Sequence, residues 1–440
     1  MLGNHVSPSN STISDRNSAV WPVFDLAVVG AGPAGLVTGL AAAKLGLETV
    51  IVGPRASAED GRSVALFEGA VQLLRNLGVW DAIAAATAPL DGIRLVDATG
   101  ALFRAPEVTF KAREIGFDAF GTSVPTAVLT SALEHAVARA ANPRRITSAV
   151  TGYDLRAAHA TLTTADGEQL SARLIAAADG RASPARTAAG IACKTWAYPQ
   201  TAIVTTFAHS IPHKRISTEF HRRSGPLTVV PGPDVSCGDT TSPSSGRSSG
   251  RSSGRSSGPS SSLVWVETPE NARRIAGLDD AAFLAELAGH LGGLLGRLFD
   301  VAPRRAFPLS GQTAESLGRN RVALVGEAAH VMPPIGAQGL NLSFRDAATL
   351  AAAAADGLQT TGDCGADAVL MAYSAARSRD VTSRVWTIDL LNRSLLSPYL
   401  PVHLARGAGM YAMSLVGPLR RSLMREGMMP DHALPALMRP

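Results

Sequence analysis

The chain has 440 residues, of which 46% are hydrophobic, and its formal net charge is +5. This length is enough for two or three structural units with large cores. No run of about 18 to 20 residues lacks both charges and helix breakers, so we expect no transmembrane helix. Three of the five net charges lie in one repeat, at Arg247, Arg251 and Arg255, and the rest of the chain is nearly balanced. The charge therefore gives no case for nucleic-acid binding.

The first 20 residues lack both the apolar segment of a secretory signal and the Arg-rich amphipathic pattern of a transit peptide. Their composition predicts a disordered tail over residues 1–20. Cys193, Cys237 and Cys364 lie far apart and have no metal-ligand spacing. We expect them to be reduced, structural thiols in a cytoplasmic protein, with no metal site.

The first chemical signal is "FDLAVVGAGPAGLVTGLAAAKLGLETVIVGPR". An apolar strand over 24–29 runs into a turn with Gly30, Gly32 and Gly35, an Ala/Leu-rich helix and a second strand. In such a βαβ unit the glycines permit a tight turn, the approach of a pyrophosphate and close helix packing. The pattern predicts a dinucleotide site, and a purely structural glycine-rich turn is the alternative. Gly53 stands where the second strand normally ends in an acidic residue that binds ribose, so we expect main chain or a nearby arginine to hold that sugar.

Two more motifs follow along the chain. "RLIAAADGRASPARTAAGI" reads as a strand over 173–178 that ends in Asp179 and Gly180. "RVALVGEAAHVMPPIGAQGLN" reads as a strand over 321–326 that opens into a loop and then a helix after Gly339. Together the three motifs resemble the single-component FAD-dependent aromatic hydroxylases of the p-hydroxybenzoate hydroxylase fold. "GRSVALFEGAVQLLRNLGVWD", "ISTEFHRRSGPLTVVP" and "YSAARSRDVTSRVWTIDLLNRSL" resemble the ubiquinone-biosynthesis branch of that family.

The resemblance implies an α/β fold with a Rossmann-like FAD-binding domain, an inserted β-sheet substrate domain and C-terminal helices. We expect a discontinuous FAD-binding domain at 21–90, 121–192 and 305–360, a sheet domain at 91–120 and 193–304, and a helical region at 361–440. The Gly/Arg/Ser repeat at 241–262 is predicted to be a flexible insertion in a hairpin. Five apolar residues are candidates for pocket or core, with core favoured: Phe207, Phe220, Leu227, Val229 and Trp265.

The resemblance also implies site residues. Glu327 would contact the flavin's ribityl chain where relatives usually have Asp, and Arg62 and Asp179 would lie near its ribose and phosphates. Pro333 and Gly336 would form the wall beside the reacting oxygen, and we predict them as catalytic. The full set predicted to bind the cofactor is Gly30, Gly32, Pro33, Ala34, Gly35, Arg62, Asp179, Gly180, Glu327, Gly336, Ala337, Gln338, Gly339, Leu340 and Asn341.

The sequence leaves the roles of two further side chains open. His330 is a candidate base, although a hydrogen-bonded histidine within the loop is favoured because flavin hydroxylation needs no histidine there. Arg186 is either a cofactor residue or a structural ion-pair partner.

The family's chemistry predicts a monooxygenase that hydroxylates a polyprenylated ubiquinone precursor through a flavin hydroperoxide, with electrons from NAD(P)H or a redox protein. The alternatives are an FAD hydroxylase of a soluble aromatic or polyketide, and a non-catalytic flavin-binding component of a quinone-biosynthesis complex. The C-terminal region mixes Leu and Met with Arg393, Arg406, Arg420, Arg421 and Arg425. This pattern suits either peripheral contact with an anionic inner membrane or helices packed on the FAD-binding domain.

Overall fold

The computed structural model describes residues 23–56, 62–100, 105–234, 258–397, 399–428 and 434–439. The predicted tail, Cys237 and most of the predicted insertion lie outside these ranges. Within them, no helix has the length and hydropathy that crossing a bilayer requires.

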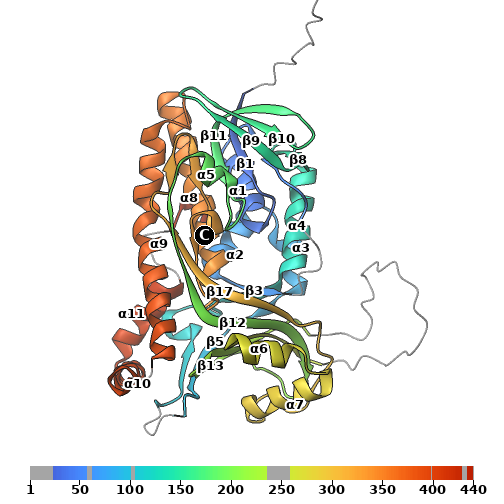
Figure 1. Cartoon of the computed structure of the whole chain (residues 1–440), viewed down its shortest axis with the longest axis vertical. Helices are drawn as coiled ribbons and strands as arrows, with labels where there is room; N and C mark the ends of the chain where they lie inside the picture. Colours follow the sequence, from blue (N-terminus) through green and yellow to red (C-terminus); the bar gives the residue numbers. More distant parts are fainter. Residues whose placement is uncertain are drawn as a thin grey trace, which may run out of the picture.

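An eight-stranded sheet forms the upper part of the molecule in Figure 1. Its central strands are parallel and almost wholly buried, which is typical of a sheet covered on both faces. In sheet order the strands are β18 (Gly318–Arg319), β19 (Val322–Leu324), β11 (Gln169–Ala177), β1 (Phe24–Val29), β2 (Thr49–Val52) and β8 (Arg144–Ile146), with β10 (Ala160–Thr164) and β9 (Val150–Leu155) added beside β11.

Helices cover this sheet and share its core. α1 packs against α8, and α8 packs in turn against the long helix α9. The described helices of this part are α1 (Pro33–Lys44), α2 (Glu68–Asn76), α3 (Trp80–Ile83), α4 (Thr126–Arg139), α5 (Pro184–Ala188), α8 (Gln338–Thr361) and α9 (Asp367–Leu396), with the 3₁₀ turns η1 (Ala84–Ala86), η3 (Gly326–Ala328) and η4 (Ala436–Met438). A small sheet of β3 (Ser63–Phe67), β7 (Gly121–Pro125) and β4 (Ala88–Pro89) lies between the two larger sheets.

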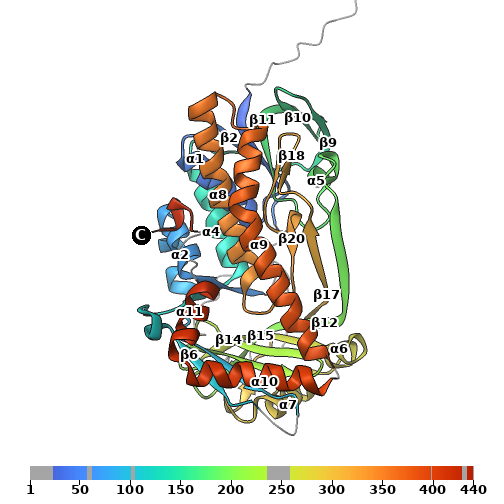
Figure 2. The same cartoon turned by 90° about the vertical axis from the view of Figure 1, so that its left-hand side faces the viewer.

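A nine-stranded, mostly antiparallel sheet forms the lower part of the molecule. Helices α6 (Pro269–Ala276) and α7 (Asp280–Leu291) cover its outer face, away from the eight-stranded sheet (Figures 1 and 2). In order the strands are β20 (His330–Val331), β17 (Arg305–Ala314), β12 (Cys193–His209), β15 (Ser260–Glu267), β14 (Gly225–Pro231), β13 (Ile216–Arg222), β5 (Gly92–Asp97) and β6 (Val108–Lys111), with β16 (Leu298–Phe299) beside β12.

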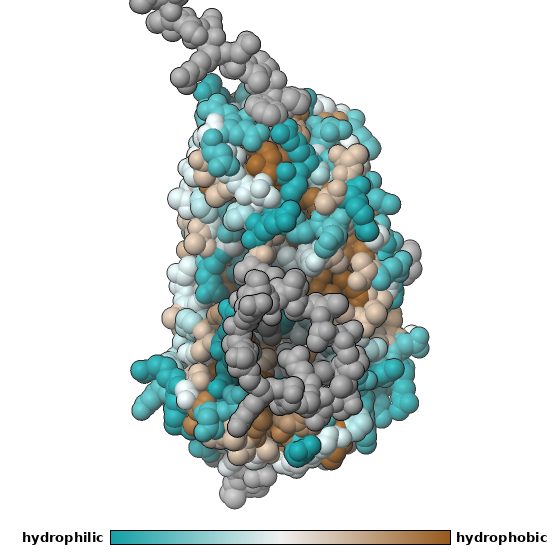
Figure 3. All heavy atoms as spheres, turned by 90° about the vertical axis from the view of Figure 1, so that its right-hand side faces the viewer, coloured by the Kyte–Doolittle hydropathy of each residue, from teal (hydrophilic) through white to brown (hydrophobic). Residues whose placement is uncertain are grey.

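The five apolar residues that sequence left between pocket and core belong to the core of this outer face. They pack with Phe283 and Leu287 of α7. Figure 3 shows a side of the molecule where hydrophilic residues predominate at the upper end and also occur at the lower edges, with hydrophobic patches between them.

The C-terminal region is helical, as predicted. After α9 come α10 (Leu400–Leu415) and α11 (Gly417–Met428), which gather at the lower end of α9 in Figures 1 and 2. Arg420 and Met424 fasten α11 to the body of the protein: Arg420 pairs with Glu114 of the 3₁₀ turn η2 (Ala112–Ile115) at 2.6 Å, and Met424 is buried beside Ala112.

The predicted α/β architecture is confirmed, with differences in detail. β17 was assigned by sequence to the FAD-binding domain but pairs with β12 in the nine-stranded sheet. β15 begins at Ser260, inside the stretch predicted to be flexible, because residues 260–263 continue the ladder with β12 and β14. The third motif's strand spans only Val322–Leu324, since the chain enters η3 at Gly326.

Candidate functional site

The first glycine turn joins β1 to α1 through very close backbone packing. Gly30 has a φ of +107°, and a Cβ atom there would lie 2.3 Å from the carbonyl oxygen of Ala178. A Cβ atom on Gly35 would lie 1.9 Å from the carbonyl oxygen of Gly30. A Cβ on Gly32 would meet no atom within 4 Å, and no side chain caps the start of α1, where Pro33 and Ala34 follow. The helix therefore presents uncapped N–H groups and its positive end to open space, as an anion site requires.

The second motif lies directly against the first. The Ala178 N–H donates to the carbonyl of Val29 (2.8 Å), which places Asp179 beside the glycine turn. Oδ2 of Asp179 accepts a hydrogen bond from the N–H of Ala185 in α5 (3.1 Å). Oδ1 is buried and has no hydrogen-bond partner among the described residues. Gly180 follows with a φ of +83° and open space where a Cβ would be.

Arg186 has a structural role. Its guanidinium donates to the carbonyls of Ala328 (2.8 Å) and Arg181 (3.0 Å), and the side chain is buried. It therefore ties the second motif to the third through backbone carbonyls, where the sequence had suggested an ion pair.

The third motif turns its acidic residue outward. Glu327 is exposed although both neighbours, Gly326 and Ala328, are buried. Its carbonyl accepts a hydrogen bond from Nε2 of Gln312 (3.1 Å) in β17. A Cβ on Gly326 would lie 3.6 Å from that of Ala34, so this turn also reaches α1. The direction of Glu327 agrees with its predicted role, which stays a prediction.

The loop that follows differs in part from the prediction. Pro333 is buried and its carbonyl accepts the N–H of Ile335 (2.8 Å), so it is Pro334 that lies exposed. Gly336 has a φ of +62°, and both Gly336 and Gly339 are exposed and face open space. The glycines thus suit the approach of a flat ring, whereas the carbonyl of Pro333 is already occupied.

Three predicted cofactor residues of this loop have structural contacts. Asn341 is buried and joins the loop to β3, because it accepts from the N–H of Phe67 (2.8 Å) and donates to the carbonyls of Ala65 (2.8 Å) and Ala337 (2.7 Å). Leu340 packs against the main core. Gln338 donates to the carbonyls of Gly336 (3.1 Å) and Gly427 (3.2 Å).

A buried charge network behind the loop was not predicted. Asp346 of α8 accepts hydrogen bonds from the N–H of Gly326 (3.1 Å), Nε2 of His330 (2.7 Å) and Nε of Arg377 (2.8 Å). Burial alone would raise the pKa of Asp346, but His330 and Arg377 outweigh it and hold that pKa below its ordinary value. His330 is therefore a hydrogen-bonded histidine, as favoured, although its partner lies on α8 and not within the loop.

The network continues along α9. Asp380 pairs with Arg377 (2.7 Å), Arg345 (3.0 Å) and Arg384 (2.7 Å). The spacing of Arg377, Asp380 and Arg384 by three and four residues was the available signal in the sequence, since such residues share one face of a helix.

An arginine lies near Gly53, but the expected contact of main chain or an arginine with the ribose stays a prediction. Nη1 of Arg145 donates to the Gly53 carbonyl (2.7 Å), and Arg145 also pairs with Glu134 (3.1 Å). Arg62 lies 5.5 Å from the ring centroid of Phe307 and has its carbonyl bonded to the N–H of Thr126 (2.8 Å).

A second buried pair lies on the sheet face opposite the α6–α7 core. His221 and Glu219 of β13 are joined by a 2.8 Å hydrogen bond, and Nδ1 of His221 is buried without a partner among the described residues. Because Phe220 packs toward α6 and α7, alternation along the strand turns this pair to the inner face of the sheet.

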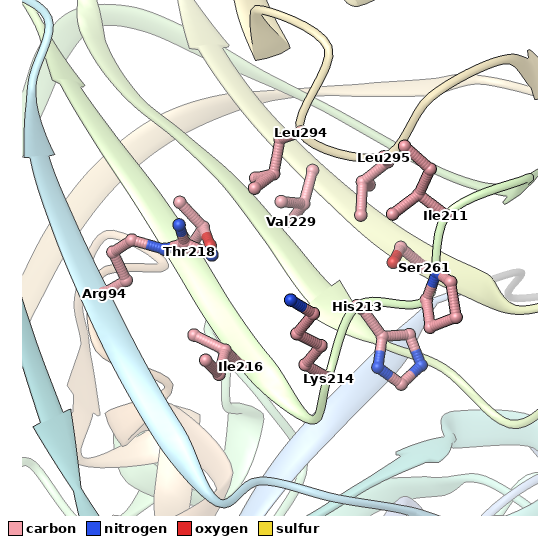
Figure 4. A pocket seen from close by; sticks show the side chains of 11 residues that line it. Arg94, Ile211, His213, Lys214, Ile216, Thr218, Val229, Ser261, Leu294 and Leu295 are labelled. Atoms are coloured by element: carbon pink, nitrogen blue, oxygen red, sulfur yellow. The ribbon is translucent and has the colours of Figure 1, made fainter.

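One cavity of about 130 Å³ lies elsewhere, on the outer side of the nine-stranded sheet. Figure 4 shows Arg94 and Lys214 pointing into it from opposite sides, below Leu294 and Val229. None of the predicted site residues lines it.

The three turns together fit a dinucleotide. A Cβ atom on Gly32, Gly180, Gly336 or Gly339 would meet no atom within 4 Å, and Oδ1 of Asp179, next to Gly180, has no hydrogen-bond partner among the described residues. A family model described as "FAD binding domain" matches residues 24–386. The chain belongs to this family.

Individual relatives and solved structures point to the same family. The chain is 32% identical over 412 residues to the ubiquinone hydroxylase UbiL of Rhodospirillum rubrum, covering 92% of this chain and 90% of the relative. It is 27% identical over 416 residues to the 3-demethoxyubiquinol 3-hydroxylase of Escherichia coli, covering 91% and 97%. The structure of p-nitrophenol 4-monooxygenase from Pseudomonas putida has a TM-score of 0.71 at 18% identity, covering 93% of this chain and 99% of that one.

The predicted membership in the FAD-dependent hydroxylases is therefore confirmed. The prediction that the protein is a flavin-dependent monooxygenase is confirmed with it. In this FAD-binding chain, the roles of the individual site residues stay predictions.

Substitutions at Gly35 and Gly32 distinguish a role in packing from a role in cofactor binding. Gly35→Ala would place a methyl group 1.9 Å from the Gly30 carbonyl oxygen, and we expect the free energy of unfolding to fall by about 3 kcal/mol in urea denaturation of the apoprotein. Gly32→Ala is the matched control, since φ is −73° and the site is open. It should change stability by about 0.5 kcal/mol at most yet weaken FAD binding in a fluorescence titration. Unchanged FAD affinity would contradict the role of Gly32.

The pH dependence of the apoprotein should report on Asp179. Burial raises its pKa, although Ser183, the Ala185 N–H and Arg186 oppose the shift. The folded state thus holds this proton more tightly than the unfolded state, so ionised Asp179 lowers stability above its folded pKa and has no such cost below about pH 4. Asp179→Asn should raise the melting temperature of the apoprotein at about pH 7, with the gain vanishing toward about pH 4. The exposed Asp166→Asn should show no such trend, and a gain independent of pH would refute the argument.

Proposed function

We propose that this chain hydroxylates the aromatic ring of a polyprenylated ubiquinone precursor. The proposal is supported by three separated backbone turns that meet at the start of α1, where Gly30 contacts Ala178 and Gly326 lies near Ala34, in a chain similar along most of its length to ubiquinone hydroxylases. We assign the turns around Gly32 and Gly180 to the phosphates of FAD and the loop around Gly336 to its ring.

The overall reaction balances with an external two-electron donor. NAD(P)H, or a redox protein, supplies two electrons, and O₂ supplies one oxygen atom to the ring and one to water. The ring loses a C–H bond and gains C–OH. Bound FAD supplies the activation of O₂, and the chain's own residues bind, orient and exclude water.

The start of α8 supports placement of the ring there. Its N-cap, Ala337, has a φ of +52° and no side chain caps the helix. The free N–H groups and positive end of a long helix stabilise negative charge on a reduced flavin. Gly336 and Gly339 leave the approach open on that side. Glu327 is turned outward from the neighbouring turn and is the residue we assign to the ribityl hydroxyls.

The nine-stranded sheet would close the site from the other side. Its inner face carries the buried Glu219–His221 pair, while its outer face is filled by the α6–α7 core. We assign the aromatic substrate to the space between this inner face and the Gly336 loop.

We further propose that the protein acts at the surface of the inner membrane, as a peripheral protein on its cytoplasmic side. A polyprenyl chain partitions into the bilayer, so an enzyme that takes such a substrate gains from lipid contact. Association with other quinone-biosynthesis enzymes would likewise help the protein to obtain its prenylated substrate.

Deletion of the gene with profiling of quinone intermediates tests the function. We expect a prenylated precursor that lacks one hydroxyl group to accumulate, and expression of the wild-type chain to clear it. The Gly32→Ala variant, with weakened FAD binding, should clear it at least tenfold more slowly at equal protein level.

Two results would argue against this assignment. An unchanged quinone profile after deletion would remove ubiquinone precursors as substrates. Full clearance by a variant shown to carry no FAD would favour a non-catalytic role in a complex.

A further inference from the structure

The lower half of α9 and the helices α10 and α11 carry an exposed apolar surface. Trp386 is 65% exposed and Leu415 is 65% exposed, values far above those of ordinary core residues. The members recur four residues apart, as in Trp386 and Leu390 or Leu419 and Leu423, so each helix presents a stripe. We call this the docking surface, and it comprises Trp386, Leu390, Tyr399, Tyr411, Leu415, Val416, Leu419 and Leu423.

Charge favours an anionic partner for this surface. Residues 399–428 contain four arginines and one glutamate, with no lysine or aspartate. Arg420 is turned inward to Glu114, whereas Arg421 and Arg425 are exposed on the same helix. Apolar side chains flanked by arginines on a helix are typical of contact with an anionic lipid surface.

The far end of α11 is bonded to the flavin loop. Nε2 of Gln338 donates to the carbonyl of Gly336 in the loop (3.1 Å) and to that of Gly427 at the end of α11 (3.2 Å). Arg384 of α9 donates to Oε1 of Gln338 (2.9 Å), to Gly427 (3.1 Å) and to Glu426 (2.7 Å). The Gln338 amide thus joins the Gly427 carbonyl of α11 to the loop at the start of α8.

The bonds from Arg384 also place a positive charge at the C-terminal end of α11. The last carbonyls of a helix lack partners within the helix and carry its negative end, which a cation such as Arg384 stabilises. Arg384 is held in turn by Asp380 (2.7 Å). A displacement of α11 would therefore have to break the bonds of Gln338 or carry the Gly336 loop with it.

We propose that the docking surface rests on an anionic lipid surface and that Gln338 transmits this contact to the flavin loop. Gln338 acts as a positioning residue: docking fixes α11, and α11 holds the Gly336 carbonyl through the Gln338 amide. The inference rests on the proposed membrane contact and deepens it, because the flavin site is ordered where the prenylated substrate is found.

The test uses the full chain loaded with FAD and vesicles of phosphatidylcholine with about one third phosphatidylglycerol. Vesicle binding is measured by co-sedimentation, and amide hydrogen exchange is followed over residues 333–341. In the wild type we expect binding to these vesicles and not to pure phosphatidylcholine, with loop exchange slowed about tenfold on binding. Gln338→Leu should bind vesicles like the wild type, but its loop exchange should no longer respond.

Control variants separate the surface from the coupling. Leu415→Asp combined with Leu419→Asp should abolish vesicle binding and leave loop exchange in free protein unchanged. Met371→Asp is the matched control, because Met371 is 66% exposed on α9 but lies roughly 20 Å along the helix from Trp386. If Gln338→Leu loses FAD, Gln338→Glu replaces it, since a carboxylate still accepts from Arg384 but cannot donate to the two carbonyls.

Each outcome tests one part of the proposal: the docking surface, its coupling to the loop, or the role of Gln338. Wild-type protein that ignores anionic vesicles, or that buries this surface in a dimer of the chain, overturns the docking surface. Binding without a change in loop exchange overturns the coupling, and a wild-type response in Gln338→Leu overturns the role of Gln338. None of these readouts requires turnover, so the quinone profile tests the proposed hydroxylation independently.

Discussion

The architecture of the site depends on the contact between the backbones of Gly30 and Ala178. Because no side-chain atom separates them, the ends of β1 and β11 can lie against each other, and the turns that follow these two strands are in direct contact. Gly35 makes a similar contact in the first turn of α1, because its lack of a side chain lets the helix approach the Gly30 carbonyl. Such contacts leave no room for an added methyl group, so they closely fix the positions of the two turns and of α1 relative to each other.

The third motif is held by polar groups and not by close backbone packing. Asp346 holds the N–H of Gly326, the His330 ring and the Arg377 guanidinium at once, and its burial makes each of these bonds costly to lose. An ion network of this kind contributes little net stability, but it selects one arrangement of the groups that it joins. The Gly336 loop thus sits on a support shared by α8, α9 and, through Gln338, α11. Changes at the C-terminal helices therefore have a physical route to the loop.

The sequence predicted the elements that local rules determine. The βαβ unit around Gly30, the strand that ends at Asp179 and the C-terminal helices follow from hydrophobic runs, glycine spacing and turn residues. What it could not predict are contacts set by tertiary packing. Nothing local distinguishes Asn341, which clamps β3 to the loop, from a residue that binds the cofactor, because both roles use the same amide. Likewise, the occupied carbonyl of Pro333 depends on how the chain returns at Ile335, and the membership of β17 depends on pairing with a strand about a hundred residues away.

The missing acid at Gly53 shows how a departure from a motif can have a structural cause. Gly53 has a φ of +155°, and a Cβ atom there would lie 3.2 Å from both the Cα of Gly30 and the N of Ala31. An acidic side chain there would strain the backbone and would press on the first glycine turn. The Gly53 carbonyl is bonded to Arg145, which Glu134 holds in place, so this corner is closed by a cation and main chain. The packing that brings β2 so near the first turn therefore disfavours a side chain at position 53, and binding of the ribose by main chain or an arginine stays a prediction.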